Sequence, residues 1–142
     1  EKFDPKVWGP HYWFFLHTIA ESYPLHPTSV TKKKYYDLMI NFPLFIPNEN
    51  IGNKFSQLLD KYPVTPYLDS RESFVRWMHF IHNKLNIQLG KEELSMPVAL
   101  ENYRNLYKPK KILLRETILT RKHIIHFIFI VLLLFIIYLL YK

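Results

Sequence analysis

The sequence has no cysteine in its 142 residues. Without a thiol, the chain can form no disulfide, no cysteine nucleophile and no thiolate metal site. Glycine is also scarce, at three residues. Because helical patterns recur along most of the chain, this scarcity favours an all-α fold. The length leaves room for one domain and little more.

Acidic residues are few in the C-terminal part, so most of the formal net charge of +7 lies there. Residues 1–107 carry 12 Lys and Arg against 11 Asp and Glu, whereas residues 108–122 carry six against one. A nucleic-acid-binding protein more often spreads its positive charge over a folded face, so we expect no nucleic-acid partner. A basic cluster directly before a hydrophobic run instead favours contact with the headgroups of a lipid bilayer.

That hydrophobic run, residues 124–141, contains 18 residues without a formal charge. It is near the shorter end of what crosses a hydrocarbon core of about 30 Å. A buried core helix would give the same pattern, but nothing else in the chain could surround it. The flanking Arg121 and Lys122 predict a single-pass, tail-anchored protein whose domain lies on the cytosolic side. We therefore divide the chain into a helical domain (1–107), a basic juxtamembrane segment (108–123) and a C-terminal transmembrane anchor (124–142).

Start and stop signals predict five helices before the basic segment. Pro10 suits a first helical turn, Thr28 or Ser29 and Asn48 suit N-caps, and Pro43 should kink or stop the second helix near Asn41. We expect residues 1–7 to be irregular and the first helix, apolar nearly all round, to be buried. The expected helices are residues 10–22, 28–41, 49–60, 70–90 and 95–103.

The fourth predicted helix carries two stripes of helical period. One is apolar and consists of Phe74, Trp77, Met78, Ile81, Leu85 and Leu89. The other is polar and consists of His79, His82, Asn83 and Asn86. The polar stripe can bind a ligand with many polar edges, or it can be a solvated face with a few core histidines. His79 and His82, joined by His17, could also approach a metal ion, but no carboxylate shares the stripe, so we expect no metal site.

Three separated pieces resemble the Erv/ALR family of FAD-linked sulfhydryl oxidases, most of all the versions of large DNA viruses. The first piece comprises Trp8-Gly9-Pro10, Trp13, His17-Thr18 and Tyr23-Pro24. The second comprises Trp77, His79, His82-Asn83, Asn86 and Leu89-Gly90-Lys91. The third, Ile46-Pro47 to Phe55, falls where the family has a CxxC motif after proline. The resemblance covers roughly residues 8–103.

The resemblance implies a four-helix bundle that cradles FAD, crossed by a short fifth helix. It implies that FAD stacks near Trp13 and meets His17, and that Lys91 lies near its phosphates. The other cofactor-binding positions that it implies are Lys6 and Gly9 in the first stretch, His79, His82, Asn83 and Asn86 around the adenine and ribose, and Tyr103 in place of a tryptophan. Family members also pair through their first two helices, which suggests a homodimer or another protein partner. Leu38, Met39, Phe42 and Phe45 could supply that face, or they could be ordinary core.

The departure from the family pattern concerns its chemistry. The two redox positions of CxxC are Asn48 and Ile51, and the second, structural cysteine pair falls at Ser73 and Met96. Thiol oxidation needs a thiolate that attacks a disulfide, and no other side chain replaces it. We therefore expect no catalytic residue and a membrane-anchored, non-catalytic structural or interaction protein of a virion or viral membrane. The alternative is an FAD-binding redox protein that works with the cysteines of a partner.

Overall fold

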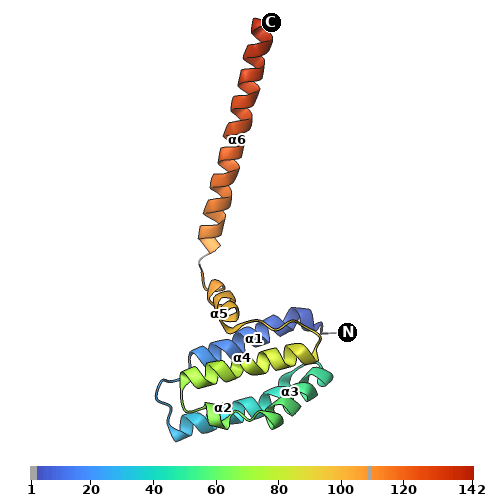
Figure 1. Cartoon of the computed structure of the whole chain (residues 1–142), viewed down its shortest axis with the longest axis vertical. Helices are drawn as coiled ribbons and strands as arrows, with labels where there is room; N and C mark the ends of the chain where they lie inside the picture. Colours follow the sequence, from blue (N-terminus) through green and yellow to red (C-terminus); the bar gives the residue numbers. More distant parts are fainter. Residues whose placement is uncertain (1–2, 109) are drawn as a thin grey trace. The chain divides into compact units, whose positions relative to one another are not determined.

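The computed structural model describes the backbone of residues 3–108 and 110–142, and the side chains of residues 3–108 and 118–142. Every regular element in this described part is helical, as the sequence predicts (Figure 1). The chain divides into two units, Glu1–Arg104 and Asn105–Lys142. The helices are α1 (Pro5–Glu21), α2 (Ser29–Asn41), α3 (Glu49–Lys61), α4 (Arg71–Gln88), α5 (Met96–Asn105) and α6 (Lys110–Tyr141), with short 3-10 turns η1 (Phe42–Phe45) and η2 (Thr65–Tyr67).

The prediction that residues 1–7 are irregular is wrong, because α1 begins at Pro5. The Asp4 side chain accepts the backbone N–H of Lys6 at 2.8 Å and caps the helix. Pro5 stands at the first helical position, where its missing N–H would have had no partner in the helix. Pro10 therefore lies inside α1 and does not open it.

The other helix ends follow the residues that the sequence marks. Thr28, Asn48 and Ser70 are N-caps, and each side chain accepts the backbone N–H three residues later. At the end of α4, Gly90 has a φ of +69°, the left-handed conformation that glycine adopts without strain. α2 stops at Asn41, and Pro43 lies in the 3-10 turn η1 that follows.

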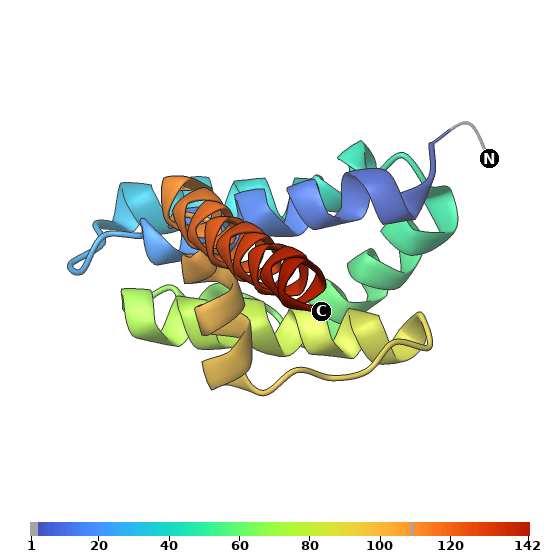
Figure 2. The same ribbon diagram turned by 90° about the horizontal axis from the view of Figure 1, so that it is seen from above.

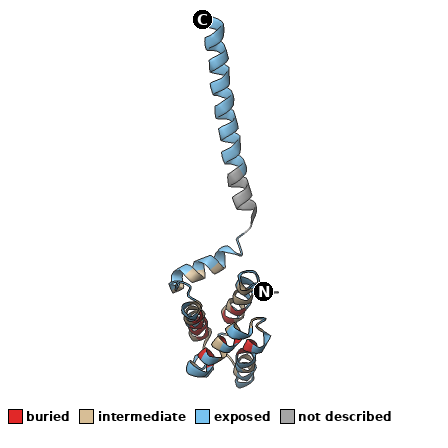
Figure 3. Ribbon diagram, turned by 90° about the vertical axis from the view of Figure 1, so that its right-hand side faces the viewer, coloured by how far each residue is buried: buried red, intermediate tan, exposed pale blue. Residues whose placement is uncertain are grey.

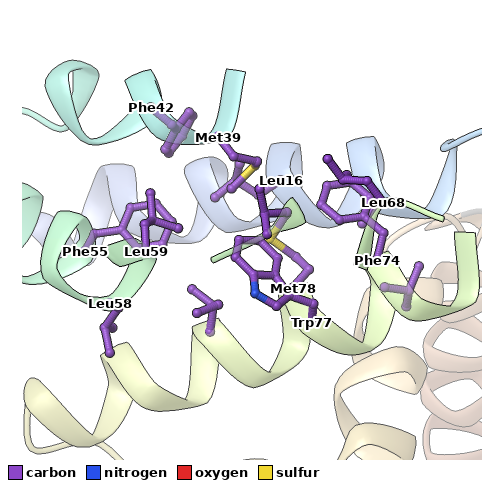
Figure 4. Close-up of a cluster of buried hydrophobic side chains, with 14 of the residues drawn as sticks. Leu16, Met39, Phe42, Phe55, Leu58, Leu59, Leu68, Phe74, Trp77 and Met78 are labelled. Atoms are coloured by element: carbon purple, nitrogen blue, oxygen red, sulfur yellow. The ribbon is translucent and has the colours of Figure 1, made fainter. Parts of the chain in front are cut away.

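The core of the first unit lies between α1 and α4, which run antiparallel, and the shorter helices α2 and α3 (Figures 1 and 2). All members of the apolar stripe of α4 are buried except Leu89, which is half-buried (Figures 3 and 4). The expected inward residues of α3, which are Phe55, Leu58 and Leu59, are buried too.

The first helix is not buried on all sides, which corrects the expectation from its apolar composition. Leu16 and Ala20 face the core, but Phe15 is 50% exposed. Phe14 and Ile19 are half-buried. The reason is geometric: α1 packs along α4 on one face, and Phe15 points away from that face toward Phe42, with ring centroids 6.4 Å apart.

The second unit contains α6, a single helix of 32 residues. The sequence separates a basic segment from an apolar one, yet one unbroken helix carries both. Its segment Ile118–Tyr141 has a mean hydropathy of 2.9 and is long and apolar enough to cross a membrane. None of that segment is buried in the described part of the chain.

Candidate functional site

An aromatic stack and an imidazole pair join α1 to α4 at the centre of the bundle. The Trp13 and His82 rings lie 3.6 Å apart at an interplanar angle of 9°. His17 Nε2 lies 3.0 Å from His82 Nδ1, a hydrogen bond between two imidazoles. The other edge of Trp13 meets Phe55 of α3, with ring centroids 6.0 Å apart. Residues that are far apart in the sequence thus form one site, which we call the histidine site (Trp13, His17, His79 and His82).

Helical spacing explains how both helices present these groups. On α1, Trp13 and His17 are one turn apart and therefore share a face. On α4, His79 and His82 share a face with Asn83, beside the apolar stripe that holds the helix against the core. The antiparallel helices α1 and α4 pack against each other, and these two faces meet in their interface.

Burial keeps the imidazoles of the histidine site neutral. Desolvation and, to a smaller extent, the nearby His79 together lower the pKa of His17 to about 4. Desolvation, followed by repulsion from His17, His79 and Lys91, lowers the pKa of His82 to about 3. The pKa of His79 is lowered by burial as well. In a neutral pair one ring nitrogen donates and the other accepts, so the site offers hydrogen-bonding edges without charge at pH 7.

Residues 91–95 form an irregular segment, the strap, that returns along α4 toward α5 (Figure 2). Asn83 holds it with both atoms of its amide: Nδ2 donates to the Leu94 carbonyl at 2.8 Å, and Oδ1 accepts the Leu94 N–H at 3.1 Å. The same Nδ2 lies 3.2 Å from His79 Nε2. Lys91 and Glu93 of the strap interact electrostatically with His82 and His79 respectively. The strap therefore borders the histidine site.

Helix α5 borders the same site through Tyr103. Its hydroxyl lies 2.9 Å from Thr18 Oγ1, and its ring centroid lies 6.3 Å from that of His17. The sequence motif includes Thr18 but does not indicate what this residue does. In the structure its hydroxyl donates to the Phe14 carbonyl and contacts the Tyr103 hydroxyl, so Thr18 anchors α5 to α1.

Comparison with protein families matches residues 10–105 to the Erv1 / Alr family. The chain belongs to this family. It is 36% identical over 108 residues to the probable FAD-linked sulfhydryl oxidase R368 of Acanthamoeba polyphaga mimivirus, covering 75% of this chain and 76% of that protein. It is 29% identical over 106 residues to the putative FAD-linked sulfhydryl oxidase 347L of Invertebrate iridescent virus 6, covering 71% and 96%.

Solved structures of the Erv1 / Alr family share the fold. The FAD binding domain of Erv1 from Saccharomyces cerevisiae matches with a TM-score of 0.65 at 27% identity, over 72% of this chain and 96% of that one. The yeast Erv1 core matches with a TM-score of 0.61 at 28% identity, over 76% and 89%. The resemblance inferred from the three sequence pieces is thus confirmed.

The positions at which the resemblance implies the redox cysteines form an ordinary helix start. Asn48 Oδ1 accepts the backbone N–H of Ile51 at 2.9 Å, and Ile51 packs against the core. Of the second cysteine pair, Ser73 Oγ donates to the Tyr67 carbonyl at 2.8 Å and Met96 packs against the core. All four positions of this Erv1 / Alr chain therefore serve structure.

The remaining residues implied by the family are placed near the site but not in its central contacts. Gly9 and Lys6 lie on the Trp13 face of α1, one turn and two turns respectively toward its N-terminus by helical spacing. The Asn86 carbonyl accepts the backbone N–H of Lys91 at 2.8 Å. Their assignment to a ligand stays a prediction.

The histidine site has no arrangement suited to a metal ion. Within the described residues, no three His, Cys, Asp or Glu side chains are grouped to hold one. His17 and His82 instead satisfy each other by a hydrogen bond.

Proposed function

We propose that this chain is a membrane-anchored Erv1 / Alr protein that binds FAD and has no thiol oxidase activity of its own. In this proposal it acts as a structural or interaction protein of a viral membrane or virion. The viral relatives R368 and 347L support the setting, and the apolar segment Ile118–Tyr141 supports the anchor.

The observation that carries the loss of activity is the fate of the redox positions. Oxidation of a dithiol to a disulfide removes two electrons and two protons and requires a thiolate nucleophile. Asn48 offers an amide that is engaged as a helix cap, and Ile51 offers only an aliphatic side chain. Neither can donate or relay electrons, and the sequence contains no other cysteine to do so.

The histidine site fits a flavin by the chemistry of its donors. The Trp13 indole offers a flat surface for stacking, and the neutral, half-buried imidazoles of His17 and His82 present hydrogen-bonding edges. Lys91 is exposed and can attract a phosphate. FAD, when bound, supplies a two-electron acceptor. The protein's own contribution is to hold and desolvate it.

The direct test is the absorbance of the purified full chain in detergent, followed by oxygen uptake with dithiothreitol. We expect flavin absorbance and no oxygen uptake above that of free FAD. A colourless protein that binds no added FAD would remove the cofactor from the proposal. Rapid oxygen uptake would show that thiols reach the flavin without the CxxC pair, and would favour the alternative of a redox protein that works with a partner's cysteines.

A matched variant sharpens this test. Asn48→Cys/Ile51→Cys restores the missing pair at the start of α3, and we expect it to couple dithiothreitol oxidation to oxygen reduction. Asn50→Cys/Asn53→Cys places the same two residues on exposed positions of α3 and is the control. If both variants remain inactive although they contain FAD, the loss of activity has another cause than the missing cysteines.

The membrane part of the proposal has its own test. Deletion of residues 118–142 should release the protein from co-sedimenting membranes, because this removes the apolar segment. Protease should reach the first unit only from the cytosolic side, since Arg121 and Lys122 directly precede the uncharged run of residues 124–141. Protection of the first unit inside sealed vesicles would reverse the proposed orientation.

A homodimer is the partner we propose. Of the face suggested by the sequence, Met39 and Phe42 are buried in the core and are not available, whereas Phe45 is exposed. Leu44 is exposed at 80%, and Phe15 and Ile40 add further apolar surface beside η1. Leu44→Asp should shift the detergent-solubilised protein to monomers in light scattering. Leu25→Asp, on an exposed loop, is the control.

A further inference from the structure

The strap over the histidine site is attached to the bundle by few polar contacts, and Asn83 supplies two of them. Its residues 91–95 have no regular structure and are exposed. Along the strap, the Lys91 N–H bonds to the Asn86 carbonyl at 2.8 Å, and Glu93 lies 3.8 Å from Lys84 in a largely exposed ion pair. An exposed pair of this kind contributes little. Asn83 makes two hydrogen bonds with Leu94, and the Leu94 backbone also interacts with His79.

The geometry of these two bonds fixes the orientation of the amide. The Leu94 N–H can only donate, so the Asn83 atom that meets it must be Oδ1, and Nδ2 must then face the Leu94 carbonyl. Nδ2 also lies 3.2 Å from His79 Nε2. One amide thus ties the strap, α4 and one imidazole of the histidine site together.

The part of the strap that Asn83 holds lies against the site. Lys91 is close enough to His82, and Glu93 to His79, for each to act on the charge of that imidazole. Tyr103 of α5, which follows the strap, lies beside His17. Movement of the strap away from α4 would uncover the imidazoles from this side.

We propose that Asn83 is a positioning residue that latches the strap over the histidine site and so slows the release of a bound flavin. This differs from the role that the family resemblance implies for Asn83, which is direct contact with the adenine and ribose. Both amide atoms are already engaged by Leu94, which favours the latch. The effect on flavin release rests on the proposed function, whereas the hydrogen bonds of the latch form without a ligand.

The latch is tested first on the ligand-free full chain in detergent, by hydrogen exchange of the Leu94 amide. Asn83→Leu removes both bonds, and we expect exchange about tenfold faster, the effect of one or two lost hydrogen bonds. Asn83→Asp keeps an acceptor for the Leu94 N–H and should exchange more slowly than Asn83→Leu. Asn53→Leu, at an exposed position of α3, is the control and should exchange like the wild type.

Flavin release is measured next on the same proteins loaded with FAD, by the return of free-flavin fluorescence on dilution. We expect Asn83→Leu to release FAD about tenfold faster while the association rate changes less than about threefold, because the latch acts after binding. If Asn83 acted only by direct contact with the adenine, Asn83→Leu would leave Leu94 exchange unchanged. A general loss of stability would raise exchange throughout the bundle and not only in the strap.

A second variant guards against misfolding of Asn83→Leu. Leu94→Pro removes the donated N–H from the exposed strap without altering α4. It should speed FAD release as Asn83→Leu does, and the double variant should add little, because the two changes break one latch. Unchanged Leu94 exchange in Asn83→Leu, or unchanged FAD release in both variants, would overturn the proposal. If the wild type binds no FAD, the proposed function fails, and the exchange measurement still decides whether the latch exists.

Discussion

The histidine site and the start of α3 are neighbours whose side chains do different things. They are linked by Phe55, whose ring meets Trp13 and which lies one turn after Ile51 on α3. The first region brings stacking and hydrogen-bonding groups together. The second region contributes a helix cap and aliphatic packing. The comparison teaches that ligand-binding groups and electron-relaying groups depend on separate side chains, so one set can be present without the other.

The largest expected effect is that acid destabilises the protein through the histidine site and not through the start of α3. The folded-state pKa values of His17 and His82, about 4 and about 3, lie below the value of about 6.5 in an unfolded chain. The unfolded state therefore binds protons first, and stability falls as the pH drops from about 6.5 toward 3. We expect a loss of several kcal/mol for the pair over this range.

The measurement is denaturant unfolding at pH 7.5, 5.5 and 4, followed by tryptophan fluorescence, since Trp8, Trp13 and Trp77 all lie in the first unit. His17→Gln should flatten the pH dependence because it removes one titrating group and keeps a hydrogen-bonding side chain. His26→Gln, on an exposed loop, is the control. An unchanged slope in His17→Gln would show that the acid lability arises elsewhere.

FAD affinity should respond to the histidine site and hardly to α3. Trp13→Leu removes the stacking face, and stacking of this kind is worth roughly 1–3 kcal/mol, so we expect affinity to fall by about ten- to a hundredfold. Ile51→Val should change affinity by less than about threefold. The dissociation constants follow from flavin fluorescence titration. Equal losses in both variants would mean that the two regions are one site after all.

At the start of α3, the packing against η1 should be the feature most sensitive to substitution. A Cβ added to Gly52 would lie 2.8 Å from the Pro43 carbonyl oxygen, and a backbone atom cannot move aside easily. We expect Gly52→Ala to destabilise the bundle by about 1–3 kcal/mol in the same unfolding measurement. Gly9→Ala, with nothing within 4 Å, should be neutral or slightly stabilising. A neutral Gly52→Ala would show that η1 can shift.

The smallest expected effect comes from the former redox position itself. Asn48→Ala removes the helix cap and should lower stability by about 1 kcal/mol without changing FAD affinity. Asn50→Ala, on an exposed position of the same first turn, should do neither. A change in FAD affinity in Asn48→Ala would indicate that position 48 still takes part in binding.

Much of the fold follows from local signals. The caps at Thr28, Asn48 and Ser70 and the left-handed Gly90 mark helix ends because each satisfies backbone groups by itself. The start of α1 did not follow, because two prolines compete for it and the capping by Asp4 favours Pro5. The exposure of Phe15 did not follow either, because apolar composition does not say which face of a helix meets a neighbour.

The candidate site follows from the sequence in part. Helical periodicity places His79, His82 and Asn83 on one face, and the family resemblance adds Trp13 and His17. Neither predicts the stack of Trp13 on His82 or the attachment of Leu94 to Asn83. The strap has no periodic pattern, and its contacts arise only when the chain doubles back on α4, so no local signal marks them.

The cap at Asn48 has a consequence for any introduction of a CxxC pair at the start of α3. Replacement of Asn48 alone by cysteine would forfeit the hydrogen bond that starts the helix and would yield a single thiol that cannot form an intramolecular disulfide. Replacement of Ile51 alone would exchange aliphatic packing for a thiol that also has no partner. Either single change is expected to lower stability without supplying a disulfide, so a dithiol pair at these positions requires both changes together.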